Sequence, residues 1–133
     1  MSDDASAKKI LIAEDDLALW PLWDSFFNQQ KDPVDIHWTV SCEEAIKMVD
    51  QANTEKHSFD LIITDIFLAG SGTGMELLVS PEVKKSCARK LLVSVVDRQD
   101  ILEKYGDAIS DAEVISKPFD VKRYAAVIDN LLK

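Results

Sequence analysis

Three acids, one hydroxyl and one lysine stand at the ends of short apolar runs: Glu14, Asp15, Asp65, Ser94 and Lys117. A carboxylate beside an apolar run is costly to bury unless a positive charge compensates it. One lysine cannot neutralise three carboxylates, so these residues would need a cation if they lie together. Oxygen ligands with room for water suit Mg²⁺, and the residue types therefore predict a magnesium site.

The apolar runs that would position these side chains alternate with stretches of helical spacing. The runs are rich in Ile, Val and Leu, which is typical of strands that are buried on both faces of a sheet. These predicted strands span residues 9–13, 36–40, 60–64, 91–96 and 112–116. Apolar residues at three- and four-residue spacing predict helices near 19–27, 45–49, 77–83 and 121–131, with a short polar helix near 97–105.

This alternation predicts an α/β fold, a flavodoxin-like, doubly wound (βα)5 sandwich. Right-handed crossovers leave little alternative to a parallel sheet with helices on both faces, and we expect a five-stranded sheet in the order 2-1-3-4-5. In such sheets the functional crevice lies at the carboxyl ends of the strands, beside the point where the strand order reverses. Residues that follow the first, third, fourth and fifth strands should therefore converge there.

Helix starts carry their own signals. Asp16 can cap the first helix, and Ser41 with Glu44 three residues later predicts a capping box for the second. Residues 80–81, Ser followed by Pro, indicate a break and restart within the third helix. Pro21 lies several residues past the Asp16 cap, so it either kinks the first helix or delays its start.

The bulk composition bounds the class of protein. The 133 residues fit one domain, which we expect over residues 8–133 after a flexible N-terminal tail over residues 1–7. No stretch approaches the ~18 apolar residues of a membrane-spanning helix, and the polar start lacks the apolar core of a secretion signal, so we expect a cytoplasmic protein without membrane insertion. The formal net charge of −9 disfavours direct binding to nucleic acid. Cys42 and Cys87 show no metal-ligand spacing and are assigned no chemistry.

Four motifs occur in a consistent order at the ends of the alternating strands: "ILIAEDD", "DLIITD", the serine that ends "LLVS", and "ISKPF". Together they resemble the receiver domain of bacterial two-component response regulators, of the chemotaxis-regulator type. The resemblance covers residues 8–133. It implies a signalling switch that is phosphorylated on its own aspartate, with slow autodephosphorylation, and not a turnover enzyme.

The resemblance implies a role for each acid. Asp65 would accept a phosphoryl group from the phosphohistidine of a sensor histidine kinase or a phosphotransfer protein. Asp15 and Asp65 would bind Mg²⁺ directly, and Glu14 would bind it through water. The backbone carbonyl of Phe67 would complete the protein ligands.

The resemblance also implies how the switch works. Ser94 and Lys117 would engage the phosphoryl oxygens, and the surface made by the fourth helix, fifth strand and fifth helix would shift to favour a downstream protein target. Pro118 fits the family's *cis* peptide after the lysine. We expect a protein without an output domain, which acts through a partner, in a phosphorelay, or as part of a longer regulator.

The loop after the third strand departs from the family pattern. Ala69 stands where a proline is usual, and Gly74 comes one residue later than usual, which indicates an insertion. Val95 occupies a position that is normally very small so that the phosphodonor can enter. Val114 replaces the usual aromatic switch residue, which argues against a relay through a rotating tyrosine.

Two apolar residues bear on the lifetime of the phosphorylated state. In the family, hydrolysis depends on the side chains two residues past the phosphoacceptor and two past the switch hydroxyl, here Phe67 and Val96. Neither can orient an attacking water, so we predict a long-lived phosphorylated state.

Three other functions each agree with part of the sequence. A receiver-like interaction module that is never phosphorylated stays open because of the loop insertion and Val95. The segment 70–74, "GSGTG", resembles a dinucleotide-binding turn, but the next strand end offers no ribose-binding acid. A haloacid-dehalogenase-like phosphatase needs a second acid two residues after its nucleophile, and Phe67 occupies that place.

Overall fold

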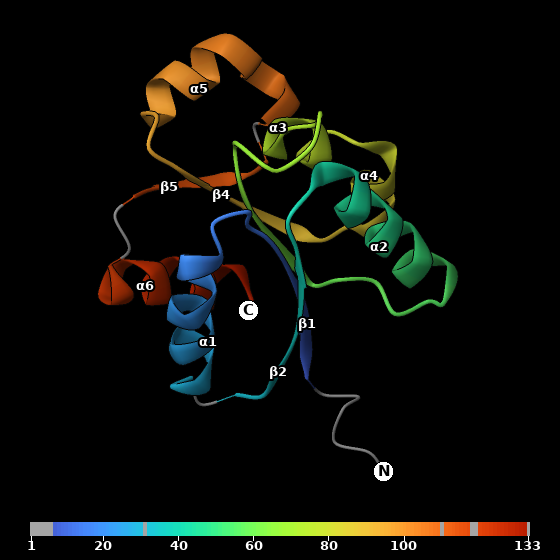
Figure 1. Ribbon diagram of the computed structural model, residues 1–133, viewed down its shortest axis with the longest axis vertical. Coiled ribbons are helices and arrows are strands. Elements are labelled where there is room, and N and C mark those ends of the chain that lie inside the picture. Colours follow the sequence, from blue (N-terminus) through green and yellow to red (C-terminus); the bar gives the residue numbers. More distant parts are fainter. Residues whose placement is uncertain (1–6, 31, 110, 118–119, 133) are drawn as a thin grey trace.

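The computed structural model describes residues 7–30, 32–109, 111–117 and 120–132. It contains a five-stranded parallel sheet in the order β2-β1-β3-β4-β5, which confirms the predicted order (Figure 1). The strands are β1 (Lys8–Ala13), β2 (Val34–Thr39), β3 (Leu61–Asp65), β4 (Arg89–Ser94) and β5 (Glu113–Ser116).

Helices cover both faces of the sheet (Figure 1). One face packs against the first and last helices, and the other against those between β2 and β5. The helices are α1 (Trp20–Asn28), α2 (Cys42–Thr54), α3 (Gly74–Leu78), α4 (Pro81–Ser86), α5 (Arg98–Tyr105) and α6 (Val121–Leu131), with short 3-10 turns η2 (Leu17–Leu19) and η3 (Gly106–Ile109).

The two faces of the sheet follow the alternation of side chains along each strand. In β1, Leu11 points to the core under α2–α5, whereas Ile10 and Ile12 point to the core under α1 and α6. In β3, Ile62 and Ile63 divide in the same way. Because both faces are covered, the buried centres of β1, β3 and β4 are apolar at successive positions, as predicted, whereas β2 is less buried and carries polar residues.

The strand bounds differ from the apolar runs. β2 begins at Val34 and ends at Thr39, because the ladder to β1 pairs Lys8 with Val34 and continues through polar residues. β4 ends at Ser94, the last residue paired with β5, so the apolar run over 91–96 extends past the strand. Pairing with a neighbouring strand sets the ends of these strands, and composition does not.

The helix starts largely follow the sequence signals. Asp16 accepts a hydrogen bond from the Ala18 N–H, but it caps the turn η2, and α1 begins only at Trp20 with Pro21 in its first turn. The proline therefore delays the helix and does not kink it. The predicted break is confirmed, because Ser80 caps α4 after α3 has ended.

The predicted capping box is only half formed. The Ser41 hydroxyl accepts from the Glu44 N–H at 3.1 Å, as expected. The Glu44 carboxylate, however, accepts from the Thr39 hydroxyl at 2.5 Å, which competes with the backbone N–H that a full box would use.

The apolar spacing over 19–27 predicts that Leu22 shares the buried helix face with Trp23, Phe26 and Phe27. This is wrong for Leu22, which is exposed on α1, while Trp23, Phe26 and Phe27 are buried as expected. No helix in the described ranges is long and apolar enough to cross a membrane. Most of the predicted tail, and Pro118 with its expected *cis* peptide, lie outside the described residues.

Candidate functional site

Three of the predicted site acids converge at the carboxyl ends of the central strands. Glu14 and Asp15 follow β1 directly, and Asp65 is the last residue of β3. One carboxylate oxygen from each of the three lies within 4.8 Å of the others. Adjacent parallel strands that end at the same level bring together residues that are fifty positions apart in the sequence.

Lys117 follows β5, and its ammonium lies close to two of these acids, Asp65 and Glu14. Lys117 Nζ lies 2.6 Å from Asp65 Oδ2 and 3.9 Å from Glu14 Oε1. Burial alone would lower the pKa of Lys117, but the hydrogen bond to Asp65 and the charges of Asp65 and Glu14 outweigh it, so the pKa is raised overall. The lysine is therefore charged and bound to the predicted phosphoacceptor.

Glu14 is the most buried of the acids, with 3% of its surface exposed. Burial raises the pKa of Glu14 to about 7, and the negative charges of Asp65 and Asp15 add to the rise. The Asp16 N–H, which donates to Glu14 Oε2 at 3.2 Å, and the Lys117 ammonium act in the opposite direction without cancelling it. The Asp16 N–H and the Lys117 ammonium therefore compensate only part of the cost of a negative charge on Glu14.

The Asp65 carboxylate is held at both oxygens. The Ile66 N–H donates to Oδ1 at 2.8 Å, and Lys117 donates to Oδ2. The Asp65 carbonyl packs so closely on Gly74 that a Cβ at residue 74 would lie 1.8 Å from the carbonyl oxygen. Only glycine fits there, and the Gly74 N–H donates to the Ile66 carbonyl at 2.7 Å.

The loop that follows β3 is tied to the start of α2. The Ala69 N–H donates to the Val40 carbonyl at 2.9 Å, and the Ser71 hydroxyl donates to Glu43 at 2.7 Å. The hydrogen bond from Ser71 lowers the pKa of Glu43. Phe67 lies in this loop with its side chain exposed, and the use of its carbonyl as a metal ligand stays a prediction.

Ser94 is brought to the same end of the sheet. It ends β4, one residue beyond Val93, which is paired in register with Asp65. Its hydroxyl is buried and accepts from the Val96 N–H at 2.8 Å. Among the described residues this hydroxyl makes no hydrogen bond to Asp65 or Lys117, so its role stays a prediction.

The donor set fits Mg²⁺. Carboxylate oxygens are the hard ligands that this ion prefers, and three of them lie close enough together to share one ion. Asp15 is exposed, so water can reach the same place and fill further positions. Glu14, Asp15 and Asp65 bring more negative charge than the one ammonium of Lys117 can balance.

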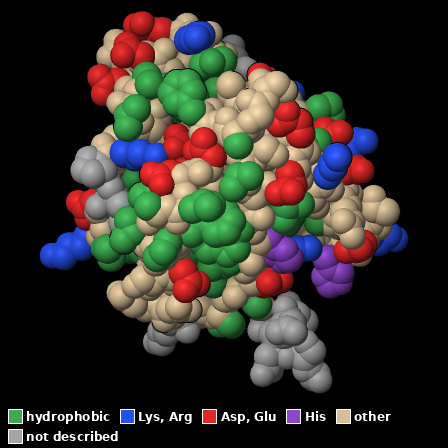
Figure 2. Space-filling model, in the orientation of Figure 1, with side chains coloured by type: hydrophobic (Ala, Val, Ile, Leu, Met, Phe, Trp, Pro, Cys, Tyr) green, Lys and Arg blue, Asp and Glu red, His purple; other side chains and the backbone are tan. Residues whose placement is uncertain are grey.

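An apolar groove of about 660 Å³ adjoins these acids. Figure 2 shows acidic side chains gathered above a broad apolar area on one face of the molecule. Two large apolar side chains near the site are strongly exposed, Phe67 at 64% and Val95 at 74%. The groove is lined by Glu14, Asp16, Leu19, Leu22, Trp23, Val93, Val95, Lys117 and Tyr124.

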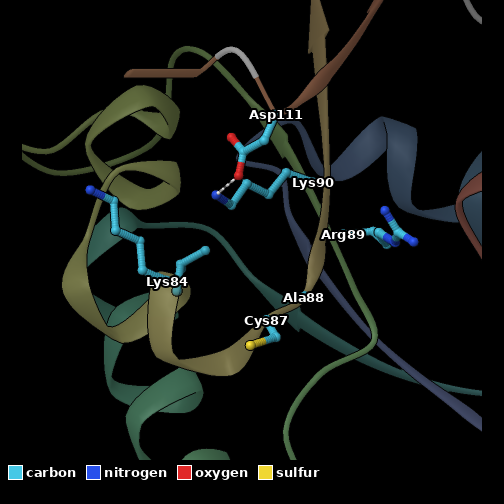
Figure 3. Close-up of a pocket in the computed structure, with 7 residues that line it drawn as sticks. Lys84, Cys87, Ala88, Arg89, Lys90 and Asp111 are labelled. Carbon is cyan, nitrogen blue, oxygen red and sulfur yellow. Dashed lines mark hydrogen bonds and ion pairs between the residues drawn. The ribbon is translucent and has the colours of Figure 1, made fainter. Parts of the chain in front are cut away.

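A second lysine–aspartate pair, which the sequence does not predict, lies at the opposite end of the sheet. Lys90 Nζ, from β4, lies 2.7 Å from Asp111 Oδ2, just before β5 (Figure 3). The pair lines a cavity of about 350 Å³, to which Lys84 and Arg89 also contribute. In the sequence Lys90 directly precedes the apolar run at 91–96, and nothing there indicates its partner.

Solved structures of similar fold exist, although no protein-family model and no curated protein matches the sequence. A response regulator receiver protein from Sinorhizobium medicae is 18% identical, with a TM-score of 0.76 over 96% of both chains. A CheY-like response regulator receiver domain from Methanospirillum hungatei is 21% identical, with a TM-score of 0.76 over 95% of this chain and 94% of that one.

A signal receiver domain from Vibrio parahaemolyticus is 17% identical, with a TM-score of 0.78 over 95% of this chain and 90% of that one. The identities are low, so the likeness concerns the arrangement of the backbone. The chain has the fold of response-regulator receiver domains, as the resemblance of its motifs implied.

Proposed function

We propose that this protein is a phosphorylation-dependent signalling switch of the two-component type, which works in the cytoplasm and accepts a phosphoryl group on Asp65. The observation that carries the proposal is the site at the carboxyl end of the sheet, where Lys117 meets Asp65 at 2.6 Å beside two more acids. The fold alone hosts many functions, so these side chains, and not the fold, support the chemistry.

Phosphoryl transfer to Asp65 needs positioning and charge neutralisation more than a general base. A carboxylate oxygen attacks the phosphorus of a phosphohistidine in line with its phosphorus–nitrogen bond. An oxygen–phosphorus bond forms, the phosphorus–nitrogen bond breaks, and its electron pair stays on the imidazole nitrogen. The Lys117 ammonium lies where it can stabilise charge on the phosphoryl oxygens.

A divalent cation would be held by Glu14, Asp15 and Asp65, with the Phe67 carbonyl as a further ligand. When bound, Mg²⁺ would neutralise these acids and the oxygens of the incoming phosphoryl group. The acids are close enough for this, and their shared negative charge favours it.

The switch would follow from the new charge on Asp65. A phosphoryl group adds up to about two negative charges and three acceptors. The Ser94 hydroxyl accepts from Val96 and donates to no described residue, so it can turn to donate to a phosphoryl oxygen. That movement would bias the surface of α5, β5 and α6, where we expect a downstream protein target to bind.

The phosphodonor would be a sensor histidine kinase or a phosphotransfer protein. The apolar groove beside the site, together with exposed Phe67 and Val95, offers such a protein a surface on which to dock. Because the phosphoryl group ends on the chain's own aspartate, the protein is not a turnover enzyme.

Val95 favours a second candidate function. Its exposed side chain stands at the rim of the site, where the resemblance calls for a very small residue that admits the phosphodonor. If it blocks entry, the same groove would serve a receiver-like interaction module that is never phosphorylated.

Intact-mass measurement after incubation with acetyl phosphate and Mg²⁺ tests the proposal. We expect the wild-type protein to gain the mass of one phosphate, and Asp65→Asn to gain none. Asp111→Asn is the matched control, since it makes the same change in the other lysine–aspartate pair, and it should be phosphorylated like wild type. A wild-type protein that stays unmodified by acetyl phosphate, phosphoramidate and a histidine phosphodonor alike would instead support the interaction module.

A further inference from the structure

Trp20 belongs to the segment "WPLW" at 20–23, to which the proposed function assigns no role. It is the first residue of α1, and Pro21 lies in the first turn of that helix. Proline lacks the N–H that an interior helical position uses and has a φ suited to a helix start, so α1 begins here and not directly after Asp16. The delayed start brings the Trp20 ring to the loop that follows β1.

The Trp20 indole is held on two sides. Its Nε1–H donates to the Glu14 carbonyl oxygen at 2.9 Å. Its ring stacks on Trp38 of β2, with ring centroids 4.9 Å apart and planes 27° apart. Trp38 is paired in register with Ile12 of β1, so the stack is anchored to the sheet. The carbonyl that Trp20 binds belongs to the peptide unit joining Glu14 to Asp15.

Other contacts hold the rest of this loop but leave that peptide unit to Trp20. The Glu14 N–H donates to the Thr39 carbonyl at 2.9 Å, and the Asp16 N–H donates to the Glu14 carboxylate. In the part of the chain that the structure describes, the Glu14 carbonyl accepts a hydrogen bond from the Trp20 indole alone. Rotation of this peptide unit would turn the Asp15 side chain relative to Glu14.

We infer that Trp20 is a positioning residue of the site: its indole N–H fixes the Glu14–Asp15 peptide and so presents both carboxylates to a divalent cation. This inference rests on the proposed magnesium site, and Trp20 touches no reacting atom. A hydrogen bond of this kind changes an equilibrium constant by about fivefold. We therefore expect the loss of the indole N–H to weaken Mg²⁺ binding by about that factor.

Trp20→Phe removes the N–H and keeps a ring that can stack on Trp38. Calorimetric titration with Mg²⁺ should give about fivefold weaker binding than wild type. Phosphorylation by acetyl phosphate should need more Mg²⁺ for its half-maximal rate, with the maximal rate unchanged. Trp38→Phe is the matched control: it changes the other ring of the stack in the same way, keeps the indole N–H on Glu14, and should bind Mg²⁺ within about twofold of wild type.

If Trp20→Phe fails to fold, an NMR titration of the wild-type chain tests the role of Trp20 instead. The NMR signal of the Trp20 indole N–H should shift on addition of Mg²⁺ with the same midpoint as the Ile66 amide, which donates to Asp65. An indole signal that does not move while the Ile66 amide does would overturn the inference, as would unchanged Mg²⁺ affinity in folded Trp20→Phe. In both cases the proposed function survives. A wild-type protein that binds no Mg²⁺ overturns the inference and the proposed magnesium site together.

Discussion

The two lysine–aspartate pairs lie at opposite ends of one sheet and are nearly equal in length. At the carboxyl end, Lys117 lies 2.6 Å from Asp65, and at the amino end, Lys90 lies 2.7 Å from Asp111. The two pairs differ in which partner is the more buried. The Asp65 side chain is only 13% exposed beside a lysine at 23%, whereas the Asp111 side chain is 66% exposed and its lysine only 7%.

The charges around the two pairs also differ. Lys117 faces Glu14 as well as Asp65, with Asp15 close by, so the acids outnumber it. Among the described residues, Lys90 forms an ion pair with Asp111 alone, and the Asp111 side chain lies largely in water. Two short ion pairs can therefore have different roles. In the Lys90–Asp111 pair the charges balance and the acid is solvated, which suits a structural role. Around the Lys117–Asp65 pair the acids are in excess and Asp65 is shielded from water, which suits cation binding and reaction.

Substitution of each lysine should give the largest difference between the two pairs. Lys117→Met should slow phosphorylation by acetyl phosphate about a hundredfold or more, because it removes a positive charge from the transferring phosphoryl group. Lys90→Met should leave that rate unchanged. Rates from phosphate incorporation over time give the comparison, and equal rates for the two variants would refute it.

Two glycines extend the comparison to the backbone. Gly74→Ala would place a Cβ 1.8 Å from the Asp65 carbonyl oxygen and should cost about 3 kcal/mol of unfolding free energy. Gly106, which precedes β5 at the amino end, has open space around it, but its φ of +54° and ψ of −130° form a conformation that glycine adopts far more readily than other residues, so Gly106→Ala should cost about 2 kcal/mol. Denaturant unfolding measures both, and a larger cost at Gly106 would contradict the packing argument.

Asp111→Asn should destabilise the fold by about 1 kcal/mol at neutral pH, because it leaves the buried ammonium of Lys90 without its acid. The hydrogen bond from Lys90 lowers the pKa of Asp111 below its usual 3.8. A lowered pKa in the folded state means that the stabilisation is present above the unfolded pKa and is lost as the pH falls through the folded one. The unfolding free energies of wild type and Asp111→Asn should therefore converge as the pH falls below the usual aspartate pKa of 3.8, and a gap that widens in acid would contradict this sign.

The smallest expected effect concerns access to the carboxyl end. Val95→Ala should raise the rate of phosphorylation by acetyl phosphate by a small factor, because the exposed side chain at the rim of the site becomes shorter. Pseudo-first-order rates at equal donor concentration measure it. A slower variant would show that Val95 helps to bind the donor instead of obstructing it.

The sequence predicted features that depend on local pattern and chain order. The strand order follows from apolar periodicity, and the break before α4 follows from the Ser80–Pro81 pair. The proximity of Glu14, Asp65 and Lys117 follows from the rule that the carboxyl ends of parallel strands converge. Each needs only the residue types near a strand or helix end.

Features set by the three-dimensional placement of side chains were not predictable. The Lys90–Asp111 pair depends on how β4 and the approach to β5 lie against each other, and the hydrogen bond from Trp20 depends on where α1 begins. The capping box is only half formed because the Thr39 hydroxyl, at the end of the strand that leads into α2, donates to the Glu44 carboxylate. Competition of this kind leaves no pattern in the sequence.

The central claim is that surplus acid at the carboxyl end of the sheet holds a divalent cation, and calorimetric titration with Mg²⁺ tests it most directly. We predict one bound ion per wild-type chain, affinity at least tenfold weaker for Asp15→Asn because a charged ligand is lost, and wild-type affinity for Asp111→Asn. An absence of binding to the wild-type protein, or equal binding by the two variants, would contradict the account.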